Sequence, residues 1–109
     1  MAIAHVASGE VVDVQPLGDQ LGEARTAALF KTDGLEVMRL VMPAGKAMPA
    51  HWVKGEVTLQ CLEGEVELMA GGTVRRMKAG QLVWLEGEVD HALTAVQPSS
   101  VLLTIVLRK

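Results

Sequence analysis

The sequence predicts an all-β fold. Short apolar or alternating runs recur along its 109 residues, and turns that contain glycine separate them, which is typical of a sandwich or barrel of antiparallel strands. The first clear pair of strands is residues 26–31 and 35–42, which flank the turn signal Thr32-Asp33-Gly34. This arrangement predicts a hairpin.

A second hairpin is predicted around Gly71 and Gly72. Apolar side chains alternate with mostly acidic ones over residues 65–70, and residues 73–78 follow the two glycines as the returning strand. Glycine adopts positive φ at little steric cost, which a tight hairpin turn requires. The pattern therefore indicates two antiparallel strands joined at the glycine pair.

Three further strands are expected towards the C-terminus. Residues 81–85 and 91–96 lie on either side of an acidic turn at 86–90, and the apolar run 101–107 has the character of a buried strand. Only residues 17–28 have a composition that also suits one or two helical turns. Two glycines within that stretch disfavour a long helix.

The length and charge of the chain exclude several classes of function. The chain can bury a core but is too short for separate catalytic and recognition domains. A formal net charge of -3 without a basic stripe predicts no nucleic acid partner. The single cysteine, Cys61, cannot form an intrachain disulfide and the N-terminus has no signal-peptide pattern, so we expect a cytoplasmic protein. The longest apolar run is far shorter than the roughly 20 residues of a membrane-spanning helix, so no membrane partner is expected.

The chemistry-bearing candidates centre on His51 and His91. The chain has no G-x-S-x-G elbow, no phosphate-binding glycine loop and no C-x-x-C pair, which removes several enzyme classes. Gly45 precedes His51 by five intervening residues. Val53 lies two positions and Val57 six positions after His51, and six residues separate Val57 from Gly64.

A matching pattern surrounds His91. Gly80 lies eleven positions before His91, and Glu86 and Glu88 are two of the residues between them. The two stretches together resemble the paired motifs of the RmlC-like cupin superfamily, over roughly residues 35 to 107. In those motifs the first histidine is followed by a second histidine and a glutamate, and the second motif contains a proline and a glycine.

What the resemblance implies is a double-stranded β-helix, or jelly-roll barrel, over residues 35–107. Residues 1–34 would form an N-terminal extension with edge strands and a short helical turn, and the whole chain, 1–109, would be one domain. In metal-bearing members three histidines and one glutamate hold a divalent transition metal. Here only His51 and His91 remain of that set, because Val53 and Val57 stand at the other two positions, so the metal motif is degenerate.

Glu56 lies one position from the place of the missing glutamate. Side chains alternate along a strand, so Glu56 points away from the lumen if Val57 points into it. A bulge at Gly55 would shift the register by one residue and turn Glu56 inward. Glu56 is therefore kept as the alternative third metal ligand beside His51 and His91.

The same alternation predicts the wall of a ligand pocket. Val53, Val57, Leu59 and Cys61 should share one inner face, and His51 and His91 should be the polar groups in it; these six are the predicted ligand-binding residues. A few polar groups in an apolar cavity are typical of a small-molecule site.

Three functions follow as hypotheses. The first is a homodimeric binding protein that holds a small molecule in the barrel lumen near the two histidines. The second is a metal-dependent oxygenase or isomerase with an incomplete metal site. The third is a structural dimerisation module in which edge strands near the N-terminus pair between subunits.

Overall fold

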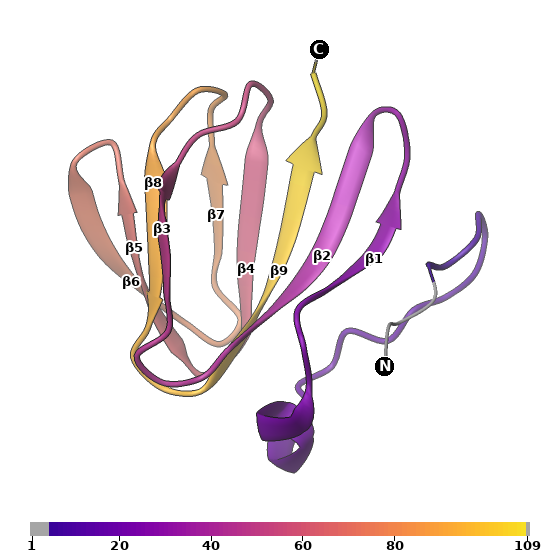
Figure 1. The fold of residues 1–109 in the computed structure, drawn as a ribbon, viewed down its shortest axis with the longest axis horizontal. Coiled ribbons are helices and arrows are strands. Elements are labelled where there is room, and N and C mark those ends of the chain that lie inside the picture. Colours follow the sequence, from indigo (N-terminus) through magenta and orange to yellow (C-terminus); the bar gives the residue numbers. More distant parts are fainter. Residues whose placement is uncertain (1–4, 109) are drawn as a thin grey trace.

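The computed structural model describes residues 5–108 and has two antiparallel sheets (Figure 1). The five-stranded sheet has the order β1-β2-β9-β4-β7, and the four-stranded sheet has the order β3-β8-β5-β6. The strands are β1 (Ala27–Lys31), β2 (Leu35–Met42), β3 (Ala47–His51), β4 (Val57–Glu63), β5 (Glu65–Ala70), β6 (Thr73–Lys78), β7 (Leu82–Leu85), β8 (His91–Ala95) and β9 (Ser99–Val106). The predicted hairpins are confirmed, because β1 pairs with β2 and β5 pairs with β6.

The core lies between the two sheets. Strand β4 shows the expected alternation, with Val57, Leu59 and Cys61 buried and the residues between them half-buried. Strands of both sheets contribute to one contiguous cluster of buried side chains, so the sheets pack face to face. Its members are Leu40, Met42, Val57, Leu59, Cys61, Val66, Leu68, Met77, Leu85, Leu93, Ala95, Val101 and Leu103.

Strand β2 departs from this alternation in its second half, where four consecutive residues are buried. Leu40 and Met42 belong to the core. Arg39 and Val41 point to the opposite face and are buried because the N-terminal segment covers them. The Arg39 guanidinium donates to backbone carbonyls of that segment, and the Val41 N–H donates to Thr26 Oγ.

A short 3-10 helix, η1 (Gly18–Glu23), leads into β1 at one end of the sheets (Figure 1). It lies within the stretch where sequence suggested one or two helical turns. The Glu63 carboxylate holds its start, accepting hydrogen bonds from the N–H groups of Leu17 at 2.8 Å and Gly18 at 3.0 Å, and from the Ser100 hydroxyl. No helix in the described part of the chain is long and apolar enough to cross a membrane.

These contacts decide the charge state of Glu63. Burial acts to raise the pKa of its carboxyl. The hydrogen bonds from Leu17, Ser100 and Gly18, together with the positive charge of Arg39, outweigh that effect and hold the pKa below its ordinary value. The carboxylate therefore stays ionised while it ties the N-terminal segment to β4 and β9.

The turn between β4 and β5 depends on Gly64. Its φ is +81°, a region that L side chains rarely adopt, and a Cβ there would overlap the Pro98 carbonyl oxygen and the Ser99 side chain. Gly72, between β5 and β6, has nearly the same φ of +80° but has open space around it. The two glycines therefore share a backbone conformation, but only Gly64 has neighbouring atoms where a Cβ would lie.

We predict that Gly64→Ala is much more destabilising than Gly72→Ala. Each variant carries the backbone strain of positive φ, about 1–2 kcal/mol. Gly64→Ala should lose roughly 2 kcal/mol more, because the new methyl group displaces backbone at residues 98 and 99. Urea unfolding of both variants measures the difference, and equal losses of stability would show that the β4–β5 turn tolerates a side chain.

Candidate functional site

His51 and His91 lie side by side. They are register partners at the end of the β3–β8 ladder, beyond a bulge that follows Met48. Their ring centroids are 4.5 Å apart and the ring planes are inclined by 54°. The pairing of β3 with β8 thus joins the two histidines that the sequence singled out, although 40 positions separate them in the chain.

Each histidine is oriented by its own backbone. Nδ1 of His51 lies 3.2 Å from the Pro49 carbonyl oxygen, and Nδ1 of His91 lies 3.0 Å from that of Val89. A carbonyl oxygen only accepts hydrogen bonds, so Nδ1 carries the proton in both rings and Nε2 of the neutral ring is an acceptor.

The two Nε2 atoms remain available. Neither has a hydrogen-bond partner among residues 5–108. In the same range no side-chain nitrogen or oxygen is both sealed from solvent and without a partner, so Nε2 of the buried His91 must reach open space. In their neutral form the two rings therefore present the Nε2 lone pairs to whatever enters.

A small cavity adjoins the two rings. Its volume is about 20 Å³, which is close to the space of one water molecule. His91 is buried and His51 is exposed, so His51 stands at the mouth and His91 lies further in. The lining is otherwise hydrocarbon and thioether: Leu40, Met48, Leu59, Ala92, Leu93 and Leu103.

Only one of the four predicted wall residues lines this cavity, namely Leu59. Val57 and Cys61 point into the core on the same strand face, and Val53 is half-buried against that core. Alternate residues on a strand are about 7 Å apart, so a cavity of this size touches only one of three successive inward side chains. Val57, Leu59 and Cys61 share one buried face of β4, but the cavity covers only part of it, and Val53 lies outside the strands.

Several lining residues were missed from the sequence. Leu40 on β2 and Leu103 on β9 come from strands outside both motifs, and Met48 comes from the strand that carries His51. Parity within residues 35–42 and 101–107 separates inward from outward residues. It does not show which strands lie opposite the histidines, because that depends on the pairing of β3 with β8.

Glu56 does not join the histidines. Its Oε1 accepts a hydrogen bond of 2.9 Å from the indole Nε1 of Trp84, which is 56% exposed on the outer side of the five-stranded sheet. Among residues 5–108 no three His, Cys, Asp or Glu side chains are grouped so as to hold a metal ion. Catalytic zinc and facial-triad iron sites use at least three protein ligands, so this donor set does not fit such a centre.

Comparisons with known proteins agree with this architecture. No protein-family model and no curated protein matches the chain. Among solved structures, a conserved Streptococcus pyogenes protein of unknown function matches with a TM-score of 0.77 and 20% identity over 100% of this chain and 96% of the other. A cupin superfamily protein of Desulfitobacterium hafniense matches with a TM-score of 0.77 and 15% identity over 90% and 95%.

An enzyme shares part of the fold. Salicylate 1,2-dioxygenase from Pseudoaminobacter salicylatoxidans matches with a TM-score of 0.63 and 17% identity, over 68% of this chain and 20% of the enzyme. These likenesses, together with the two antiparallel sheets, show that the chain has the all-β jelly-roll fold of the cupins.

The chemistry of Cys61 follows from its place in the core. Burial raises the pKa of its thiol; a backbone hydrogen bond at Glu63 opposes that shift, and the negative charges of Glu63 and Glu65 add to it. The thiol is therefore protonated at neutral pH and closed to reagents.

We predict that Cys61 reacts with a thiol-specific reagent at least about 100-fold more slowly in the native protein than in urea. It is the chain's single cysteine, so the absorbance of the released leaving group reports on it alone. The urea-unfolded protein provides the control. Rapid stoichiometric labelling of the native protein would contradict the buried, neutral thiol.

Proposed function

We propose that this chain is a binding protein that takes a small molecule at the mouth of the lumen, where His51 and His91 orient it. The observation that carries the proposal is the pair of free Nε2 acceptors set in an otherwise hydrocarbon lining. Small-molecule sites commonly combine a mostly apolar wall with a few convergent polar groups. Neutral imidazoles that accept hydrogen bonds favour a ligand with a hydroxyl, amide or amine donor.

The size of the cavity limits how much of a ligand can enter it. Room for about one water molecule admits a single donor group, so the body of the ligand lies outside, against the exposed His51. Met48 lines the cavity, and its flexible thioether is the side chain best able to move aside for a larger group. We infer a ligand that inserts one polar group between the histidines and keeps the rest at the rim.

A metal-dependent oxygenase or isomerase is the second candidate. The same two free Nε2 atoms favour it, because imidazole nitrogens with a lone pair are common metal ligands. The fold also occurs in a dioxygenase, although a shared fold by itself does not establish a shared reaction. The described residues offer no third donor beside the histidines, so this candidate requires a ligand from outside the described protein.

The homodimer stays a prediction. Strand β1 is one of the two edge strands of the five-stranded sheet, and an open edge is a common place for subunits to pair. Val6 already donates its N–H to the Leu29 carbonyl on this strand. Part of the β1 edge is thus used within the chain, and a partner subunit would have to pair beside that contact.

The binding proposal predicts a thermal shift that depends on both histidines. In a screen of uncharged hydroxyl- and amide-bearing metabolites, a ligand at tenfold its Kd should stabilise the protein by about 1.4 kcal/mol and raise Tm by roughly 5–10 °C. His51→Ala and His91→Ala should abolish the shift. His5→Ala, which removes an exposed histidine elsewhere, should keep it, and a hit that both lumen variants retain would disprove this site.

The metal content separates the two candidates. Elemental analysis after native purification should find well under one equivalent of iron, manganese, nickel or zinc per chain, because two imidazoles alone bind a divalent cation weakly. The His91→Ala variant should give the same values as the wild type. One equivalent of metal in the wild type, lost in His91→Ala, would establish a metal centre and favour the enzyme.

A further inference from the structure

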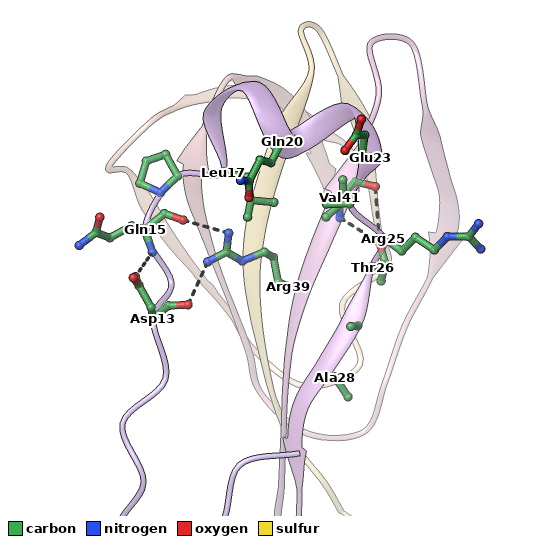
Figure 2. A pocket seen from close by; sticks show the side chains of 13 residues that line it. Asp13, Gln15, Leu17, Gln20, Glu23, Arg25, Thr26, Ala28, Arg39 and Val41 are labelled. Carbon is green, nitrogen blue, oxygen red and sulfur yellow. Dashed lines mark hydrogen bonds between the residues drawn. The ribbon is translucent and has the colours of Figure 1, made fainter. Parts of the chain in front are cut away.

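A second and much larger concavity lies on the outside of the five-stranded sheet (Figure 2). This groove has a volume of about 930 Å³ and is bounded by residues 13–28 on one side and by Arg39 and Val41 of β2 on the other. It lies by η1, whereas His91 begins β8 at the opposite end of the sheets (Figure 1). The groove is therefore separate from the lumen site.

Arg39 lies at the base of the groove and is only 7% exposed. Figure 2 shows its guanidinium turned towards the N-terminal segment, where Nη1 donates to the Gln15 carbonyl at 2.9 Å and Nη2 to the Asp13 carbonyl at 3.4 Å. A guanidinium has five N–H donors. Its Nε has no partner among the described residues and is not sealed from solvent, so the guanidinium keeps donor capacity.

The charge of Arg39 is also incompletely balanced. The ion pairs found within residues 5–108 involve Arg76 only, so no carboxylate there contacts Arg39. Glu63 is near enough for the guanidinium to lower the pKa of its carboxyl, but its oxygens are occupied by Leu17, Gly18 and Ser100. Neutral carbonyls replace only part of the hydration that a buried cation loses, and a contacting anion would replace more of it.

We propose that this groove binds a small amphipathic carboxylate, whose carboxylate group pairs with the Arg39 guanidinium. The planar guanidinium matches a carboxylate through parallel N–H···O bonds, which the compact charge of a lysine cannot reproduce. Leu17, Ala28 and Val41 supply apolar surface for the body of the ligand. The volume lies in the range of small-molecule pockets and exceeds what an inorganic ion would need.

A purely structural role for Arg39 predicts a different binding preference. If the guanidinium served only to fix the backbone of Asp13 and Gln15, the groove would have no preference for anions. Hexanoate and hexanamide separate the two roles, because they share an aliphatic body and differ in charge at one end.

The test is a titration of isotopically labelled full-length protein with hexanoate, followed by amide chemical shifts. We expect saturable shifts in residues 13–28 and 39–41, and none at residues 48, 51 and 91–93 around the lumen. Hexanamide and inorganic phosphate should each bind at least about tenfold more weakly, since one lacks the charge and the other the apolar body. Equal affinity for either probe, shifts confined to the lumen, or no saturable shifts would overturn the proposal.

Variants locate the charge requirement. Arg39→Gln should weaken hexanoate binding at least about tenfold, and Arg39→Lys should weaken it as well because the forked donor is lost. Arg76→Gln, which removes an exposed arginine on β6, should leave binding unchanged and serves as the control. Hexanoate binding that survives Arg39→Gln undiminished would overturn the assignment.

A groove-filling change tests the site without touching Arg39. Ala28→Leu places a larger side chain in the lining, so a folded variant should also bind hexanoate at least about tenfold more weakly. This result decides the matter even if Arg39→Gln does not fold. Unchanged binding by a folded Ala28→Leu variant would place the ligand outside the groove. Because the lumen histidines take no part, failure here would leave the lumen proposal intact.

Discussion

The position of β9 governs the rest of the structure. This strand comes last in the chain yet lies in the middle of the five-stranded sheet, with all eight residues paired to β2 on one side and six of them paired to β4 on the other. Within that sheet, β9 joins the β1–β2 hairpin to the pair β4 and β7. Because side chains alternate along β9, this strand contributes to both faces of the sheet. Leu103 lines the lumen, and Ser100 donates to the Glu63 carboxylate.

Two neighbouring residues of β2 show how one strand serves two sites. Leu40 points inward and lines the lumen near the histidines, and Arg39 points outward to the groove beneath the N-terminal segment. The period of two in a strand forces adjacent residues to opposite faces. A segment that covered only solvent-facing polar residues would gain little, but here it covers Val41 and brings backbone carbonyls to the Arg39 charge.

The sequence was sufficient to predict the hairpins and the pair of histidines, but not the remaining residues that line the site. Glycine turns and alternation predicted the hairpins, and the spacing from Gly45 to His51 and from Gly80 to His91 correctly selected the two histidines that meet. These are local patterns.

The lining by Leu40 and Leu103, and the burial of Arg39, were not predictable in this way. They depend on which distant segments pack against each other, and residues 13–17 carry no periodic signal that would mark them as a cover for β2.

The proposed lumen site favours a neutral ligand and the proposed groove site favours an anion. The difference follows from which charges are buried. In the lumen, the lining apart from the two histidines is hydrocarbon and thioether, so a charged guest would lose hydration and gain only two imidazole contacts. A neutral molecule with one hydrogen-bond donor loses far less on entering. On the outer face the buried charge belongs to the protein, and the cost of its lost hydration is already part of the folded state. An anion that pairs with Arg39 therefore relieves a cost, whereas an ion entering the lumen would incur one.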